Sequence, residues 1–394
     1  MNPLRFMLIA GEPSGDLLAA ELAQALRDRL RSKGQPAPEF FGAGGPRMAE
    51  SGVALELDLT RYAIIGFADV LRNLWRLRQI LRDMIALARE RRPDVIVCVD
   101  YGGFNRRFAA ALRAHPLPGW NPRLVQYVSP QVWASRPSRA RTLARDLDLL
   151  VSILPMERAW YAARYPNFNV QFVGHPIIDR HPGALERQPP ATEPPPHLLL
   201  LPGSRPAEIA RHWPVMVAAA RLVQSAVPAH WTAVFVDEPL RQAALAADPG
   251  TDLPLETRVG GLSEALSRST LAIASTGTVT LECALWQVPT LALYKASWST
   301  YQIARRIIKV RHLALPNLLA AEPVMPEFLQ DAAEPERIAR AATRLLQDPQ
   351  ERARVRSRLR DLIQLLGSPG AAHRAADAIL ALTLPGHPTG PPPS

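Results

Sequence analysis

Hydrophobic positions along the chain follow two alternating patterns. Short runs such as 6–10 and 95–100 are almost entirely apolar, which is typical of strands buried on both faces of a parallel sheet. Between them lie longer stretches with helical spacing, as in 17–30, where leucines recur every four residues. This alternation predicts an α/β fold. Further strands are expected within 40–48, 124–155, 170–179, 198–201, 231–238, 271–275 and 289–296, and further helices from 206 onward and over 263–268, 334–346, 351–366 and 371–384.

A proline-rich segment at 181–197 interrupts this pattern and predicts a linker. The halves on either side, 1–180 and 198–366, both alternate strands with helices. We therefore expect two Rossmann-like, doubly wound α/β domains that face each other across a cleft. A C-terminal helix at 367–384 packs either on the first domain or on a partner chain. The tail at 385–394 has the composition of a disordered segment.

Composition and charge narrow the class of protein. The chain has 394 residues, of which 47% are hydrophobic, and a formal net charge of +10. A basic chain favours an anionic partner, such as nucleic acid, an acidic lipid surface or a phosphorylated substrate. The basic residues are scattered and no RNA-binding motif accompanies them, so nucleic acid is not expected. No apolar run reaches the roughly 18 residues of a membrane-spanning helix, and the N-terminus lacks a signal-peptide cleavage pattern.

Cysteine and histidine usage points to neither disulfides nor a metal. Cys98 and Cys283 each lie in an apolar run, which is typical of core residues in a reducing compartment. No group of cysteines and histidines has metal-ligand spacing, so no metal site is predicted.

Two turns in the second half have the pattern of phosphate-binding sites. In the first, a run of leucines is followed by Gly203, Ser204 and Arg205 and then by a helix start, where free N–H groups, the helix dipole and a guanidinium favour an anion. The second, Ser275–Glu282, places Thr276, Gly277 and Thr278 at a helix start. Glu282 lies about two turns further along, within reach of a ribose hydroxyl. Ordinary strand–helix turns with a solvated arginine and a simple N-cap remain the alternatives.

The first half contributes acidic residues at strand ends. Asp100 follows a buried strand and is either a general base in the crevice of a doubly wound sheet or a helix N-cap. Glu12 lies in the turn GEPSGD, where it is either functional or solvated, and Ser14 or Asp16 is expected to cap the next helix. The absence of a lysine-bearing Walker motif argues against a kinase or ATPase.

Residues 61–89 combine helical apolar spacing with arginines. A helix that faces the core is one interpretation. A basic amphipathic segment lying in the headgroup layer of an anionic membrane is the other. The docking residues would be Ile64, Ile65, Phe67, Leu71, Arg72, Trp75 and Arg76.

Seven motifs then occur in order between residues 6 and 330: GEPSGD, PDVIVCVD with FN, YVSPQVWA, FVGHP, LPGSR with EI, TGTVTLE, and LPNLLA with PEFLQ. On these motifs the chain resembles the lipid-A-disaccharide synthase family, which comprises inverting glycosyltransferases of GT-B architecture. The resemblance implies transfer of 2,3-diacylglucosamine from UDP-2,3-diacylglucosamine to the 6-hydroxyl of 2,3-diacylglucosamine 1-phosphate. The products would be UDP and the β-1,6-linked lipid A disaccharide 1-phosphate.

The resemblance also implies roles for single residues. Asp100 would be the base, and Glu12 would act in the chemistry or position the acceptor. The nucleotide and substrate ligands would be Ser14, Gly203, Ser204, Arg205, Thr276, Gly277, Thr278, Glu282, Asn317 and Gln330. No metal or other cofactor is expected. Here Tyr101-Gly102-Gly103 replaces the usual residues after the aspartate, including an acid, so a mechanism with two neighbouring carboxylates is not supported.

Because both implied substrates carry acyl chains, we expect a cytoplasmic, peripheral enzyme at an anionic membrane surface, the inner face of the inner membrane. A homodimer is left open. Two alternatives also stay open: another UDP-sugar enzyme of the same fold, such as a UDP-N-acetylglucosamine 2-epimerase, and a non-catalytic basic protein that binds acidic lipid.

Overall fold

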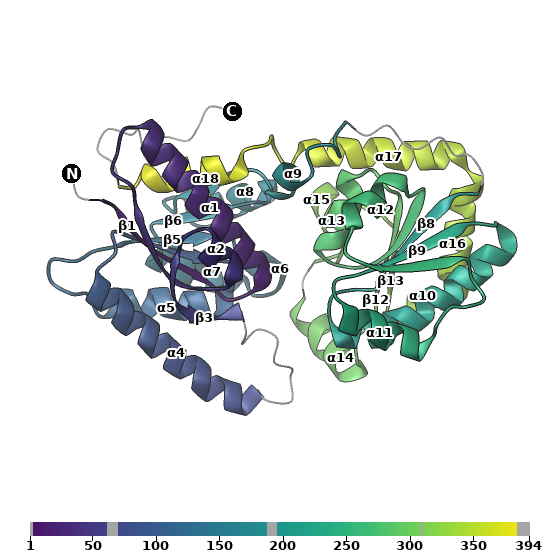
Figure 1. The fold of residues 1–394 in the computed structure, drawn as a ribbon, viewed down its shortest axis with the longest axis horizontal. Helices are drawn as coiled ribbons and strands as arrows, with labels where there is room; N and C mark the ends of the chain where they lie inside the picture. Colours follow the sequence, from purple (N-terminus) through teal and green to yellow (C-terminus); the bar gives the residue numbers. More distant parts are fainter. Residues whose placement is uncertain (1–2, 61–69, 187–194, 309, 384–394) are drawn as a thin grey trace. The chain divides into compact units, whose positions relative to one another are not determined.

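The computed structural model describes residues 3–60, 70–186, 195–308 and 310–383. The chain divides into two compact units, of which unit 1 comprises Met1–Asp179 with Gly367–Ser394 and unit 2 comprises Arg180–Leu366. Each unit has its own sheet and its own helices (Figure 1). The division falls where the proline-rich segment begins. Much of that segment and the whole of the tail at 385–394 lie outside the described residues.

Unit 1 is built on a parallel sheet of seven strands in the order β3-β2-β1-β4-β5-β6-β7. The central strands β1 and β4 are the uninterrupted apolar runs, and Ala10 of β1 pairs with Val99 of β4. The bounds are β1 (Arg5–Ala10), β2 (Glu39–Gly44), β3 (Ala54–Asp58), β4 (Val95–Val99), β5 (Arg123–Tyr127), β6 (Leu149–Ser152) and β7 (Val170–Phe172).

Helices cover both faces of this sheet. On one face, Leu22 of α1 and Ile379 of α18 lie in one buried cluster with Leu8 of β1. On the other face, Met84 of α4 and Phe108 of α5 pack around the alternate residues of the strands. The helices are α1 (Pro13–Ser32), α2 (Pro46–Glu50), α4 (Val70–Arg91), α5 (Gly102–Ala114), α6 (Val132–Ser135), α7 (Ala140–Asp146), α8 (Pro155–Ala162), α9 (Ile177–Arg180) and α18 (Ala371–Leu380).

The last helix packs on the unit formed by the first half of the chain, which is one of the two alternatives that the sequence leaves open. Arg29 of α1 forms an ion pair with Asp377 of α18 at 2.9 Å. The carboxylate of Asp179 accepts hydrogen bonds from the backbone N–H groups of Gly370 and Ala371 and so caps α18.

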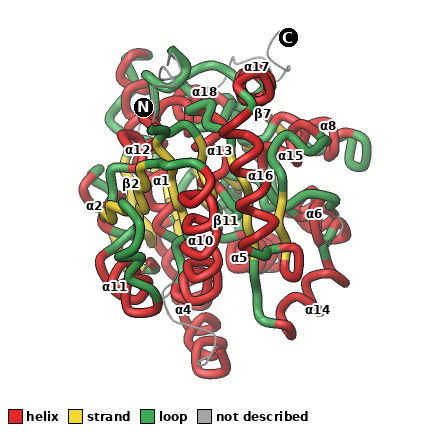
Figure 2. The backbone as a smooth tube through the Cα atoms, turned by 90° about the vertical axis from the view of Figure 1, so that its right-hand side faces the viewer, coloured by secondary structure: helices red, strands yellow, loops and turns green. Residues whose placement is uncertain are grey.

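Unit 2 repeats the design with six parallel strands in the order β10-β9-β8-β11-β12-β13. In Figure 2 the strands, in yellow, lie between helices, in red. The strands are β8 (His197–Leu201), β9 (His230–Phe235), β10 (Leu255–Val259), β11 (Leu271–Ser275), β12 (Thr290–Tyr294) and β13 (Glu327–Leu329). The helices are α10 (Pro206–Ala226), α11 (Glu238–Ala247), α12 (Leu262–Arg268), α13 (Thr278–Leu285), α14 (Trp298–Ile307), α15 (Leu315–Ala320), α16 (Pro335–Gln347) and α17 (Pro349–Gln364).

Both sheets are doubly wound, as the sequence predicts. The strand order reverses direction beside β1 in unit 1 and beside β8 in unit 2. The loops that leave the carboxyl ends of β1 and β4, and likewise of β8 and β11, therefore diverge and leave a crevice at the edge of each sheet. The predicted site residues after these four strands all fall at such a crevice.

Two local expectations had different outcomes. The strand expected within 170–179 is present and ends at Phe172, because His175 accepts a hydrogen bond from the N–H of Ile177 and the chain turns into α9. Asp16 does not cap α1, since its buried carboxylate accepts from the N–H groups of Gly45, Arg47 and Met48 instead. The stretch after residue 314 contains α15 and β13, for which the sequence pattern predicted no element.

Candidate functional site

The crevice of unit 1 brings together residues from the turns after β1 and β4. The hydroxyl of Ser14 donates a hydrogen bond to Oδ2 of Asp100 at 3.4 Å. Ser14 lies in the first turn of α1, but the N-cap position is Glu12, and no side chain caps this helix. The interaction of Ser14 is therefore with the carboxylate of the neighbouring strand end and not with its own helix.

The backbone around Asp100 holds the carboxylate in place. Asp100 and Tyr101 have φ values of 51° and 41°, in the left-handed region that non-glycine residues rarely adopt. The carbonyl of Asp100 accepts hydrogen bonds from Nδ2 of Asn105 at 2.7 Å and Nε2 of Gln126 at 2.9 Å. The N-cap of α5 is Tyr101, without a side-chain bond, so the alternative in which Asp100 caps this helix is wrong.

The environment of Asp100 changes its protonation. Burial raises the pKa of this carboxyl above its ordinary value, and hydrogen bonds from Ser14 and from the N–H of Tyr101 partly offset the rise. A carboxylate with a raised pKa is a stronger proton acceptor while it is ionised.

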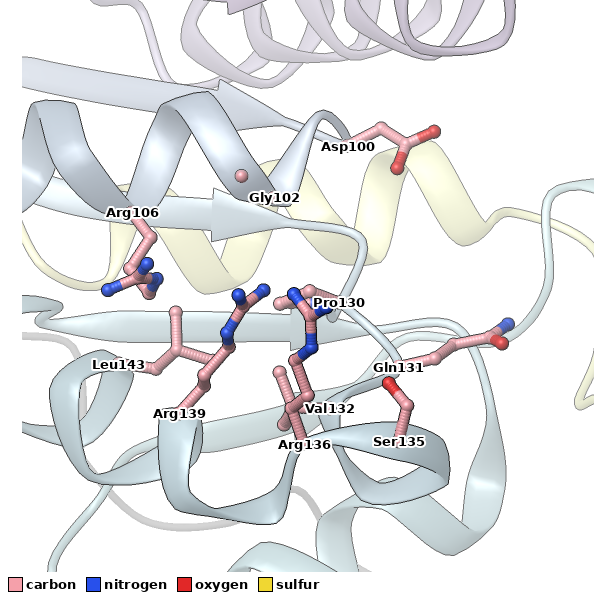
Figure 3. Close-up of a pocket in the computed structure, with 11 residues that line it drawn as sticks. Asp100, Gly102, Arg106, Pro130, Gln131, Val132, Ser135, Arg136, Arg139 and Leu143 are labelled. Atoms are coloured by element: carbon pink, nitrogen blue, oxygen red, sulfur yellow. The ribbon is translucent and has the colours of Figure 1, made fainter. Parts of the chain in front are cut away.

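Asp100 also lines a cavity of about 290 Å³ that carries three arginines. Arg106 comes from α5, and Arg136 and Arg139 come from the segment between α6 and α7. Figure 3 shows the three side chains along one side of the cavity, with Asp100 apart from them at the other end. Burial, followed by repulsion from Arg136, Arg106 and the nearby Arg107, lowers the pKa of Arg139. The sequence interpretation assigned no site role to these arginines.

A buried glutamate fixes the loop that carries Arg136. Glu157 of α8 is 1% exposed, accepts a hydrogen bond from Nε1 of Trp133 at 3.0 Å and lies 2.6 Å from the hydroxyl of Ser152. Burial raises its pKa to about 7, although these hydrogen bonds lower it. This anchor was not predicted, because Trp133 and Ser152 lie on two other elements, α6 and β6.

In unit 2, the turn after β8 has the shape of an anion site. Gly203 adopts φ 122°, and a Cβ atom at this position would lie 2.5 Å from Oε2 of Glu208. The N–H of Ser204 donates to that same oxygen at 3.0 Å, and the guanidinium of Arg205 pairs with the other carboxylate oxygen at 3.0 Å. The predicted donors therefore converge on one anionic group, here the carboxylate of Glu208.

His212 connects this turn to the end of β12. The ring is fully buried, with Nδ1 2.9 Å from the carbonyl of Pro202 and Nε2 accepting from the N–H of Lys295 at 3.0 Å. A bond from Lys295 requires an unprotonated Nε2, so Nδ1 carries the hydrogen and donates to Pro202. The imidazole is neutral, consistent with burial as the main cause that lowers its pKa.

The turn after β11 is open. Gly277 has φ 137°, and no atom lies within 4 Å of the place that a Cβ would take. Thr276 and Thr278 flank this glycine, and their side chains are half-buried and exposed, respectively. Burial raises the pKa of Glu282 to about 7, and the charge of Arg180 partly offsets this rise. Nε2 of His181 lies 3.8 Å from the carboxylate of Glu282.

Two predicted ligands serve the scaffold. The amide of Asn317 is fully buried, donates to the carbonyl of Met325 and to Glu327, and accepts from the N–H groups of Val324 and Met325. With all its hydrogen bonds used within the chain, it positions the loop before β13. Gln330 uses its side-chain amide in the same manner, on both backbone groups of Ala296.

The predicted docking residues are only partly described. Ile64, Ile65 and Phe67 lie outside the described residues, as do the side chains of Leu71 and Arg72. Trp75 is 73% exposed and Arg76 is also exposed, whereas Ile80 and Met84 of the same helix are buried. The second half of α4 thus faces the core, whereas Trp75 and Arg76 lie at the surface.

Within the described ranges, no helix is long and apolar enough to cross a membrane. Nor do three or more metal-ligating side chains gather anywhere in this part of the chain. Cys98 and Cys283 are both buried and free, as expected for core residues.

Comparisons with known proteins agree with the geometry. The family model described as lipid-A-disaccharide synthetase matches residues 6–381. A lipid-A-disaccharide synthase of Myxococcus xanthus is 36% identical over 391 residues, which cover 98% of this chain and 99% of that relative. Among solved structures, the calicheamicin glycosyltransferase CalG4 superposes with a TM-score of 0.59 at 17% identity, over 98% of this chain and 100% of that one. A UDP-GlcNAc 2-epimerase from Neisseria meningitidis, bound to UDP-GlcNAc, gives a TM-score of 0.59 at 10% identity, over 96% of this chain and 100% of that one.

Two doubly wound units of this kind define the α/β architecture of GT-B glycosyltransferases and related epimerases. At these low identities the solved structures show the fold alone. The family match and the identity to the curated relative go further: the chain belongs to the lipid-A-disaccharide synthase family. It is therefore a glycosyltransferase.

Proposed function

We propose that the protein transfers 2,3-diacylglucosamine from UDP-2,3-diacylglucosamine to the 6-hydroxyl of 2,3-diacylglucosamine 1-phosphate. The C1–O bond to the β-phosphate of UDP breaks, its electron pair leaves with UDP, and the acceptor oxygen forms a new bond to C1 with inversion. The observation that carries the proposal is the pair of crevices, one with a partly buried carboxylate and one with converging anion donors.

Asp100 is the base in this proposal. Its carboxylate accepts the proton of the acceptor hydroxyl as the new bond forms, and Ser14 orients it through the 3.4 Å hydrogen bond. Glu12 is at the N-cap of α1, in the same turn as Ser14, and we assign it to positioning of the acceptor.

Unit 2 takes the donor. When the diphosphate binds, it takes the place of the Glu208 carboxylate at the N–H of Ser204 and the guanidinium of Arg205, next to Gly203. These donors then stabilise the negative charge that grows on UDP as it leaves. The turn at Thr276, Gly277 and Thr278 is assigned to the nucleotide, and Glu282 to a ribose hydroxyl. Asn317 and Gln330 act indirectly, through the loops that they hold.

A product assay tests the reaction. Purified protein is incubated with both lipid substrates, and the products are identified by mass spectrometry. We expect UDP and a disaccharide 1-phosphate with the summed mass of both sugars. Incubation with UDP-N-acetylglucosamine alone tests the epimerase alternative, since turnover of this compound without an acceptor would contradict the proposal.

We further propose that the protein works as a cytoplasmic, peripheral enzyme on the anionic inner face of the inner membrane. The acyl chains of both substrates and the exposed Trp75 and Arg76 support this. Flotation with anionic vesicles tests it, with Arg76→Glu expected to weaken binding and Arg211→Glu, on α10 of unit 2, as the control. Equal flotation of wild type and R76E would contradict docking through α4.

The same proposal includes no metal and no other cofactor, because Arg205 and backbone N–H groups provide the charge that the leaving group needs. Turnover should then persist in excess chelator. A homodimer is a further prediction, which light scattering of the purified protein checks.

A further inference from the structure

The arginine cavity of unit 1 contains more positive charge than the protein neutralises. In the described part of the chain, no carboxylate forms an ion pair with Arg106, Arg136 or Arg139. Nε of Arg106 is buried and has no hydrogen-bond partner. Two arginines nearby do have carboxylate partners: Arg113 pairs with Asp148 and Arg145 with Asp146. Unlike these two, the three cavity arginines have no carboxylate partner among the described residues.

Gathering unpaired like charges in a cavity opposes folding unless a ligand compensates for it. Each guanidinium is a planar set of donors that suits the oxygens of a phosphate. The cavity volume of about 290 Å³ lies near the lower end of small-molecule sites, which span roughly 300–1,000 Å³. Its chemistry therefore fits a phosphorylated headgroup, and Asp100 belongs to the same lining.

We infer that Arg106, Arg136 and Arg139 bind the 1-phosphate of the acceptor sugar. This rests on the proposed function, in which Asp100 takes the proton of the 6-hydroxyl. In a pyranose, C1 and C5 flank the ring oxygen. C1 carries the phosphate, and C5 carries the CH2 group to which the 6-hydroxyl is bonded. An acceptor anchored by its phosphate at the arginines can therefore present its 6-hydroxyl toward the end of the cavity where Asp100 lies (Figure 3). The arginines select an acceptor that is phosphorylated at C1.

The donor diphosphate is a less suitable occupant. Unit 2 has its own converging donors at Ser204 and Arg205, and the arginine cavity belongs entirely to unit 1. If the cavity held UDP, its arginines would control UDP affinity, so the same experiment separates the two occupants.

The test compares two acceptors that differ only at C1, the 1-phosphate and the neutral 1-O-methyl glycoside. We expect the variant Arg136→Gln/Arg139→Gln to lose about 100-fold in kcat/KM for the phosphate acceptor, through KM, since each lost charge-assisted contact costs on the order of tenfold. Turnover of the neutral glycoside should change less than about threefold by the same argument. Because the arginines are unpaired, these changes should leave the melting temperature unchanged or raised. Arg141→Gln, an exposed residue of α7 outside the cavity lining, is the matched control.

Calorimetry with a short-chain acceptor 1-phosphate and with UDP completes the test. Weaker acceptor binding with unchanged UDP affinity supports the assignment. Equal losses for both acceptors, or a loss of UDP affinity instead, would overturn it. If the wild type binds the acceptor phosphate through these arginines but forms no disaccharide, the phosphate site stands and the proposed function fails. If the disaccharide forms and the variant keeps its preference for phosphate, the function stands and the phosphate site fails.

Discussion

The hydroxyl of Ser14 donates a hydrogen bond to the carboxylate of Asp100 at 3.4 Å, although 86 residues separate them along the chain. The two residues meet because β1 and β4 are neighbours at the point where the winding of the sheet reverses. The contact stabilises the ionised form of Asp100, while burial favours the protonated form. The protonation of this carboxyl thus depends on both turns.

Ser14→Ala should move the acid limb of the pH profile of kcat/KM to higher pH. The hydrogen bond from Ser14 lowers the pKa of Asp100, so its loss raises that pKa further. A base must be ionised, and the variant should therefore lose more activity at pH 6 than at pH 8. Ser32→Ala, at the exposed end of the same helix, is the control. A profile that stays at the wild-type position would contradict the coupling.

Arg205→Ala should weaken UDP binding by about 10- to 100-fold, the effect of losing one charge-assisted contact. Isothermal titration calorimetry with UDP measures this directly. The control is Arg211→Ala, also on α10. The guanidinium of Arg211 donates a hydrogen bond to the carbonyl of Ala207 and does not take part in the turn at Gly203. If both variants bind UDP as tightly as the wild type, Arg205 has no role in the donor site.

His212→Ala should destabilise unit 2 by about 2–4 kcal/mol, because it leaves the buried carbonyl of Pro202 and the half-buried N–H of Lys295 without their partner. Since folding lowers the pKa of His212, its contribution is present above the ordinary histidine pKa and is lost as the pH falls through the lowered one. Thermal unfolding at pH 7.5 and pH 5 should therefore show a larger difference between variant and wild type at pH 7.5. A variant of the exposed His373 should show no such difference.

Glu157→Gln should make the protein less sensitive to pH. The hydroxyl of Ser152 lies 2.8 Å from the carbonyl of Leu154 and 2.6 Å from Glu157, and its one hydrogen cannot serve both unless Glu157 is protonated. A glutamine can donate to Ser152 and still accept from Trp133.

The sign of this effect follows from the pKa of Glu157, which folding raises to about 7. The unfolded chain releases this proton at the ordinary pKa of a glutamate, and the folded chain releases it only near pH 7. The wild type therefore loses stability as the pH rises from that ordinary pKa toward 7. The loss is on the order of 3 kcal/mol. Denaturant unfolding of both proteins at pH 5 and pH 7.5 measures the difference. If the wild type and Glu157→Gln lose the same stability between pH 5 and pH 7.5, Glu157 is not protonated in the folded protein.

The sequence was sufficient for the central strands and for residues at their carboxyl ends. Short uninterrupted apolar runs are typical of buried strands. Asp100 directly follows one such run and Arg205 lies in the turn after another, so their place in the fold was predictable. The edge strands β3 and β10 were missed because each is only half-buried and carries charged residues. Their position in the sheet comes from pairing with a neighbour and not from a pattern of their own.

The remaining site residues could not be predicted, because their roles depend on contacts between distant elements. His212 acts on Lys295, 83 residues away, and Glu157 acts on Trp133, 24 residues away. The sequence around Arg106 is that of an ordinary helix, and its place beside Arg139 in the cavity comes only from the fold. Asn317 is a different case. It lies in a motif, but its side-chain amide makes its hydrogen bonds within the chain, for example to the backbone of Met325 and Val324.

The most direct test of the account is the turnover of Asp100→Asn, measured together with its UDP affinity. Asparagine keeps the size of the side chain and an oxygen for Ser14, but it cannot take a proton from the acceptor. We expect kcat to fall by about 10²–10⁴-fold while UDP binds as in the wild type, and Asp361→Asn, an exposed substitution, to change neither. Turnover near the wild-type rate in Asp100→Asn would contradict this expectation.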